Sequence, residues 1–272
     1  VAVGSCSLRR NTTGNNNTAL GSCSLMCNTT GGGNTAMGFC ALHVSTTGDQ
    51  NVAIGLNAMQ DNTTANNNTA VGFRAMDKNT TGTNNVGIGM DAMRCNTTAD
   101  NNTAVGTSAL SANTTGVQNT AIGADALKAN TTANNNVAVG DDSLAANTTG
   151  TSNVAVGQGA MNTNTEGNCN ISIGHRSMDL NTTGSNNTAV GQDAMRCNTT
   201  GTNNVAFGFC SLNCNSTASH NTAIGVEALN KNTTGCFNQA VGSFALGCNT
   251  EGCQNVAMGM SALIANTTGD KN

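Results

Sequence analysis

The residues able to do chemistry in this chain of 272 residues are twelve cysteines, three histidines and fourteen acidic residues. Thiols and imidazoles could bind zinc, and a nucleophile paired with a histidine could catalyse acyl transfer. The spacing supports neither reading, because no Cys-x2-Cys pair occurs and His43, His175 and His220 are more than two repeats apart. No Ser-His-Asp set or phosphate-binding glycine loop can be assembled. We therefore expect no catalytic residue, no metal and no cofactor.

The elements that position these residues are copies of one seventeen-residue repeat. Residues 181–197 read Asn-Thr-Thr-Gly-Ser-Asn-Asn-Thr-Ala-Val-Gly-Gln-Asp-Ala-Met-Arg-Cys. We number the places of this repeat from 1 to 17, so that place 1 falls at Asn11, Asn28, Ser45 and onward. Sixteen such copies account for residues 1–272 as a single array. A short fixed period is typical of a solenoid or a fibre, in which each copy contacts only its neighbours.

Comparison of the copies separates fixed places from free ones. Place 7 is Asn, place 11 is Gly and place 15 is Leu or Met in every copy, and place 10 is always apolar. Place 1 is Asn except at Ser45, and places 5, 6, 12, 13, 16 and 17 vary freely. The fixed places should therefore serve the backbone and the interior, and the free places should face outward.

The repeat predicts an all-β fold, a parallel β-solenoid or β-roll of sixteen seventeen-residue coils without a globular core. Places 8 to 11 read as a short strand, places 14 to 17 as a second strand or extended edge, and Asn-Thr-Thr-Gly as a return turn where Gly or Asn takes positive φ. We expect places 10 and 15 to supply the apolar core, with small residues at places 9 and 14. Coils at a spacing of roughly 4.8 Å would give a stack on the order of 75 Å long.

The invariant Asn at place 7 predicts a ladder of side chains that hydrogen-bond from coil to coil. Its members are Asn17, Asn34, Asn51, Asn68, Asn85, Asn102, Asn119, Asn136, Asn153, Asn170, Asn187, Asn204, Asn221, Asn238 and Asn255.

Asn-Thr-Thr is also an N-glycosylation sequon, so place 1 has a second reading. The candidates are Asn11, Asn28, Asn62, Asn79, Asn96, Asn113, Asn130, Asn147, Asn181, Asn198, Asn215, Asn232 and Asn266, and Asn-Asn-Thr adds Asn16, Asn67, Asn101 and Asn186. A structural ladder explains place 1 better than sugars do, because a sequon ignores place 2, yet place 2 is more constant than place 3. Both readings can hold only where the Asn points outward.

Several cysteines recur at one place and would stack at coil spacing, within reach of a disulfide. Those with a column partner are Cys6, Cys23, Cys40, Cys197, Cys214, Cys236 and Cys253. Inter-coil disulfides are one reading of these columns, and small surface substitutes for Ala or Ser are the other.

The net charge and the lengths of the apolar runs narrow the classes of partner that the chain could bind. The net charge is −4, with no basic stripe for nucleic acid and no apolar run long enough to enter a membrane. The array shows no atypical capping copy at either end, so we expect association with other copies, as a trimer or as an end-to-end filament, with glycans as further partners.

Two copies, Asn-Thr-Ala-Val-Gly-Gln-Asp-Ala-Met at residues 187–195 and Asn-Thr-Ala-Ile-Gly-Val-Glu-Ala-Leu at residues 221–229, carry a resemblance. The chain resembles the repeat arrays of tail-fibre-like and surface proteins of phages and large algal viruses. It is similar, more distantly, to the head repeats of trimeric autotransporter adhesins, which form a left-handed parallel β-roll in a trimer. The viral arrays commonly have Tyr after the place-11 Gly, where this chain has Phe39, Met90 or polar residues.

The leading hypothesis from these observations is a structural shaft of an extracellular fibre, filament or adhesin, on a virion or a cell surface. An alternative is a binding module for ice or carbohydrate that uses a flat Thr and Asn face, because Thr recurs at places 2, 3 and, in seven coils, 8. A heavily N-glycosylated filament is the third reading. Catalysis is not expected.

Overall fold

The computed structural model describes residues 1–272 and contains sixteen parallel strands, one in each repeat, and no helix. The strands are β1 (Ala2–Val3), β2 (Thr18–Leu20), β3 (Thr35–Met37), β4 (Val52–Ile54), β5 (Thr69–Val71), β6 (Val86–Ile88), β7 (Thr103–Val105), β8 (Thr120–Ile122), β9 (Val137–Val139), β10 (Val154–Val156), β11 (Ile171–Ile173), β12 (Thr188–Val190), β13 (Val205–Phe207), β14 (Thr222–Ile224), β15 (Gln239–Val241) and β16 (Val256–Met258). The predicted parallel β-solenoid of seventeen-residue coils is confirmed. The fold has no helix, and therefore no helix that could cross a membrane.

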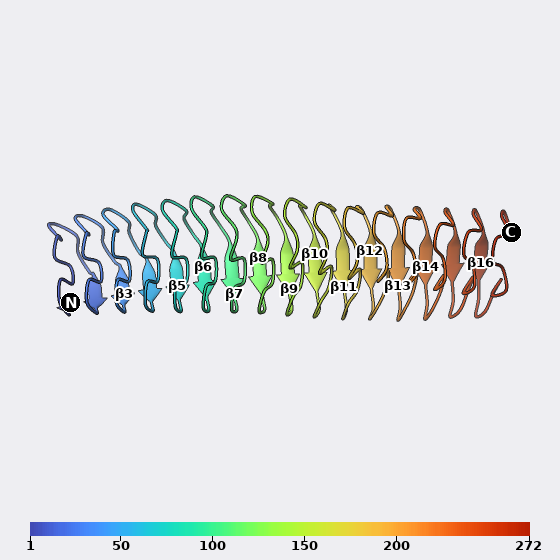
Figure 1. Ribbon diagram of the computed structural model, residues 1–272, viewed down its shortest axis with the longest axis horizontal. Helices are drawn as coiled ribbons and strands as arrows, with labels where there is room; N and C mark the ends of the chain where they lie inside the picture. The colour runs from blue at the N-terminus through green and yellow to red at the C-terminus, as the bar shows by residue number, and fades with distance from the viewer. The chain divides into compact units, whose positions relative to one another are not determined.

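The chain divides into two compact units, Val1–Asn135 and Asn136–Asn272. The first unit holds β1 to β8 and the second holds β9 to β16, and within each unit the strands lie side by side in chain order (Figure 1). Paired residues are seventeen apart, as in Ala36 with Ala53 in the first unit and Ala189 with Ala206 in the second. Within each unit, every seventeenth residue therefore lies beside its predecessor, as the repeat predicts.

Each three-residue strand, β2 to β16, directs its middle residue inward and its outer two residues outward, as a pleated strand must. Place 9 is buried, and a Cβ built on Gly87 at this place would lie 2.8 Å from Met76 Cγ at place 15 of the preceding coil. Place 10 therefore faces outward, and Ile122 is 41% exposed. The prediction that place 10 belongs to the core is wrong, because the space beside place 15 admits only the Ala, Ser or Gly of place 9.

The core of each coil consists of place 15 with the small residues of places 9 and 14. Leu110 and its small neighbours Ala104 and Ala109 are fully buried. One large apolar side chain per coil is a thinner core than the two that the sequence suggested. Hydrogen bonds between coils must therefore carry a larger share of the cohesion.

Places 12 to 17 form turns, so the predicted second strand is absent. Places 13 and 15 have positive φ in every coil, and Leu110 at place 15 has a φ of 53°. The backbone still bonds to its neighbour, because Leu110 N–H donates to Ala126 O over 2.9 Å. Positive φ also occurs at places 6 and 11, but nowhere in Asn-Thr-Thr-Gly, where the sequence had placed it.

The invariant Gly at place 11 follows from a close approach between coils. Gly106 has a φ of +136°, and a Cβ there would lie 2.4 Å from Gly123 O of the next coil. Any side chain would therefore overlap backbone as well as strain the local conformation. At Gly259 nothing lies within 4 Å of the Cβ position, but the φ of +118° still favours Gly, so the close approach and the conformation together explain the Gly at this place.

Candidate functional site

The place-7 asparagines form a continuous hydrogen-bonded column in each unit. Asn102 Oδ1 accepts from both the backbone N–H (2.9 Å) and Nδ2 (3.2 Å) of Asn119 in the next coil. Asn102 Nδ2 donates to Gly116 O over 2.9 Å, and the side chain is 1% exposed. One amide thus bonds to three groups of the following coil. The predicted asparagine ladder is confirmed.

The place-1 asparagines form a second column that bears on glycosylation. Asn96 Nδ2 donates to Asn79 Oδ1 over 2.7 Å and to Ala99 O over 3.1 Å, so both of its hydrogens are used. Among the thirteen candidates at place 1, all but Asn11 and Asn266 are fully buried. A sugar on Nδ2 would remove one of these bonds and has no room. In the folded coil, the side chains of eleven candidates are buried, namely those of Asn28, Asn62, Asn79, Asn96, Asn113, Asn130, Asn147, Asn181, Asn198, Asn215 and Asn232, which disfavours glycans there; glycosylation at place 1 stays a prediction.

The Asn-Asn-Thr sequons differ from those at place 1, because their first Asn lies at place 6 and is exposed. Asn16, Asn67, Asn101 and Asn186 all have this position. Glycosylation at these four sites stays a prediction.

One of the threonine columns, at place 2, hydrogen-bonds between coils. At place 2, Thr114 Oγ1 donates to Thr131 O over 3.1 Å, and the same bond recurs from coil to coil. At place 8, by contrast, Thr shares the outward sheet face with the apolar column of place 10. A face that presents Thr beside Val and Ile is less suited to ordering water than the Thr and Asn face considered from the sequence.

The outward side of the strands carries an exposed apolar column at place 10 beside a mixed, mostly half-buried column of Thr and Val at place 8; we call places 8 and 10 of all coils the apolar strand face. In the first unit its place-10 column runs from Val3 through Leu20, Met37, Ile54, Val71, Ile88 and Val105 to Ile122. Most of these side chains are exposed, including Leu20 at 44%. Place 12 adds Phe39, Leu56, Phe73 and Met90 in four consecutive coils, all of them exposed. Contiguous apolar surface on this scale is typical of an interaction site.

Charged side chains pair between adjacent coils. Arg74 Nε lies 2.9 Å from Asp91 Oδ1, and Lys78 Nζ lies 2.8 Å from Asp61 Oδ2. Partly exposed pairs of this kind contribute about 0–1 kcal/mol each. Asp77 is different, because it is only 8% exposed, and its burial raises the pKa of the carboxyl while Lys78 opposes the rise.

The cysteine columns are brought together, but all twelve cysteines are free thiols. Cys236 and Cys253, both at place 5, have their Sγ atoms 3.8 Å apart. Burial raises the pKa of the Cys236 thiol, and the hydrogen bond with Cys253 raises it further. Disulfides between Cys6, Cys23 and Cys40, between Cys197 and Cys214, and between Cys236 and Cys253 stay predictions.

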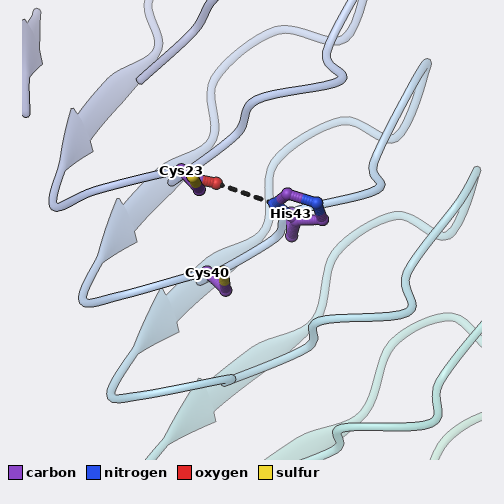
Figure 2. Close-up of side chains that lie close together, drawn as sticks. All are labelled: Cys23, Cys40 and His43. Carbon is purple, nitrogen blue, oxygen red and sulfur yellow. Dashed lines mark hydrogen bonds between the residues drawn. The ribbon is translucent and has the colours of Figure 1, made fainter. Parts of the chain in front are cut away.

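Adjacent coils also bring two cysteines to a histidine (Figure 2). One ligand atom from each of Cys23, Cys40 and His43 lies within 4.8 Å of the others, and all three side chains are half-buried. His43 Nδ1 lies 3.1 Å from Cys23 O, so the ring is held on the cysteine side. Burial raises the pKa of the Cys40 thiol, and the neighbouring Cys23 raises it further.

Reading the sequence for local metal motifs missed this thiol–imidazole cluster. Its two cysteines are seventeen residues apart and become neighbours only when the coils stack. The signal was the spacing Cys40-x-x-His43 together with a cysteine one period earlier, at Cys23. Comparison along the columns, as well as along the chain, would have found it.

No family model matches this chain, and no curated protein matches it either.

Proposed function

We propose that this chain is a structural segment of an extracellular fibre or filament, and that copies of it associate through the apolar strand face. The observation that carries the structural role is the use of the fixed places. Asn at places 1 and 7 and Thr at place 2 bond to adjacent coils, and Leu or Met at place 15 fills the interior. Residues kept constant across copies thus serve cohesion between coils, which is what stiffness requires.

The extracellular location rests on the resemblance to viral fibre arrays and adhesin heads. The proposal does not call for catalysis. The charged side chains nearest one another are mostly opposite in sign and partly exposed, as in Arg74 with Asp91, which is an arrangement for surface pairing.

Association through the apolar strand face follows from its size and composition. Eight strands at about 4.8 Å spacing and three residues at about 3.3 Å each give a face of roughly 400 Å² in each unit. A second copy that covers the face of one unit would bury roughly 800 Å² in total, and the same contact at the face of the other unit would bring the total into the range of stable complexes. Val, Ile, Leu, Met and Phe at place 10 are the side chains that gain most from leaving water. A second copy is the occupant that presents a face of matching period.

The test of association compares two lysine substitutions in one coil. Ile88→Lys places a charge on the apolar strand face, and Thr81→Lys places the same charge on an exposed place-3 residue of that coil. Sedimentation velocity across a concentration series should show an associating wild type and Thr81→Lys protein, and an Ile88→Lys protein shifted toward monomer by more than about tenfold in Kd, since burying a lone charge is costly. A wild-type chain that stays monomeric would contradict association.

The test of the structural role is separate from the test of association. Electron micrographs of the purified chain should show stiff, elongated particles of uniform width, in the Ile88→Lys monomer as well as in the wild type. Rounded or flexible particles would contradict the proposed shaft, whatever the oligomeric state.

A further inference from the structure

We propose that Cys23, Cys40 and His43 form a binding site for Zn²⁺, with two thiolates and one imidazole as the protein ligands. The three ligand atoms come from two adjacent coils and already lie within 4.8 Å of one another (Figure 2). Two sulfurs and one ring nitrogen are a donor set that zinc prefers.

The distances fit a tetrahedral ion after a small adjustment. Bonds of about 2.3 Å to sulfur and about 2.0 Å to nitrogen place tetrahedral ligand atoms roughly 3.5–3.8 Å apart. The cluster must therefore contract by about 1 Å, which rotation about the side-chain bonds supplies. The stack holds the backbone at both cysteines, since Cys23 N–H donates to Ser5 O over 2.8 Å and Cys40 N–H to Ser22 O over 3.0 Å, so the adjustment must come from the side chains.

The histidine is oriented for this role. Its Nδ1 faces the cysteines and bonds with Cys23 O over 3.1 Å. On coordination through Nδ1, the metal bond replaces this hydrogen bond, and the neutral ring carries its proton on Nε2. Both cysteines bind as thiolates, so two thiol protons leave as one Zn²⁺ enters, and the four-component centre is neutral. Three protein ligands leave the fourth position to water or to an incoming ligand.

The site is separable from the fold. Cys23 and Cys40 are at place 13 and His43 is at place 16, and both places vary freely between coils. Asn57 and Ser108 occupy place 13 elsewhere. The chain also provides a matched pair for comparison, because Cys236 and Cys253 stack with their Sγ atoms 3.8 Å apart in a coil pair whose only histidine-bearing neighbour, His220, stacks on Phe237 instead.

The test is metal titration of the full chain with all thiols reduced. Cobalt(II) should give thiolate-to-metal charge-transfer and tetrahedral d–d absorption that saturates at one equivalent and is displaced by Zn²⁺. Cys23→Ser, Cys40→Ser and His43→Gln should each weaken Zn²⁺ binding by more than about tenfold, as loss of a ligand must exceed the effect of losing an outer partner. Cys236→Ser should bind like the wild type, and circular dichroism should show every variant folded.

Four outcomes would overturn the site. The first is a wild-type chain whose cobalt complex lacks the charge-transfer band. The second is equal zinc affinity in wild type, Cys40→Ser and His43→Gln. The third is a chain purified with a Cys23–Cys40 disulfide that, once reduced, still binds no metal, which would make the cluster a redox pair. If Cys236→Ser weakens binding as much as Cys40→Ser does, the ion binds stacked thiols in general and the assigned site is wrong.

Discussion

Two apolar columns of the coil stack, at place 15 and at place 10, lie in opposite environments. Leu110 is fully buried, while Ile122 is 41% exposed. The inner column contains only Leu and Met, and the outer column contains Val, Ile, Leu, Met and Phe. In a stack this thin, apolar character does not distinguish the inside from the outside.

Backbone conformation does distinguish the two columns. Place 15 has a φ near +50° in every coil, from 47° at Leu8 to 54° at Met76. β-Branched residues tolerate that region least, which explains why Val and Ile never occur there. Place 10 is the last residue of a strand, where Val and Ile are favoured. The absence of β-branched residues was therefore the sequence signal for the inner column.

One of the two largest losses of stability should come from a substitution in the buried asparagine ladder at place 7, because its amides hydrogen-bond between coils and the side chains of place 10 do not. Asn102→Ala removes one hydrogen bond from each of the Asn119 N–H, the Asn119 Nδ2 and Gly116 O, of which the last two keep their bonds to Ala133 O and Asn113 Nδ2. At about 0.5–1.5 kcal/mol for each of the three lost bonds, the loss of stability should be about 2–4 kcal/mol. The neighbouring Asn101→Gly, at an exposed residue with a φ of 60°, should be close to neutral. Urea unfolding of both variants measures the difference, and similar midpoints would show that the ladder adds little.

A matched truncation compares the two apolar columns directly. Leu110→Ala and Ile122→Ala each remove three carbons, one inside and one outside. The first should destabilise by about 2–5 kcal/mol through the cavity it leaves. The second should cost about 1 kcal/mol or less in the dilute monomer. Equal losses would mean that the outer column is already covered within a single chain.

Some features of the fold could be predicted from the repeat and others could not. The repeat predicted the stacking register and the asparagine ladder, because an invariant place in sixteen copies leaves no other explanation. It could not predict Leu110 at positive φ, because intrinsic preferences oppose that conformation and only the stack imposes it. Alternation alone also left open whether place 9 or place 10 faced inward, since both are apolar. The Cys23, Cys40 and His43 cluster was hidden for a third reason, because it exists only across coils.

The outward places accept many residue types, but the backbone conformation at some of them is fixed. Glycine substitutions can show this constraint. Ser108 at place 13 has a φ of 55°, whereas Ser111 at place 16 has no such constraint. Ser108→Gly relieves about 1–2 kcal/mol of left-handed strain and loses about 0.5–1 kcal/mol of chain entropy, so a gain of up to about 1 kcal/mol is expected. Ser111→Gly should instead lose about 0.5–1 kcal/mol. Thermal unfolding of the pair checks the sign, and a loss in both would contradict the conformational reading.

The smallest effect concerns Asp77, a charged residue at an outward place that the stack nevertheless buries. Its Oδ1 has no hydrogen-bond partner, and Lys78 Nζ is 3.7 Å from Oδ2. Burial raises the pKa of the carboxyl, so the folded chain holds this proton more tightly than the unfolded chain does. Stability should therefore fall as pH rises above the unfolded value of about 3.9 and level off once the folded group has ionised.

Asp77→Asn should remove that fall, so that the variant gains on the wild type between pH 4 and neutrality and shows no advantage below it. Urea midpoints at a series of pH values provide the measurement, with Asp141→Asn, at an exposed place 12, as the control. Parallel curves for wild type and Asp77→Asn would show that the carboxyl is solvated in the folded chain. A difference confined to Asp77 would show that burial in this fold follows the stacking of coils, even at places where the repeat leaves the side chain free.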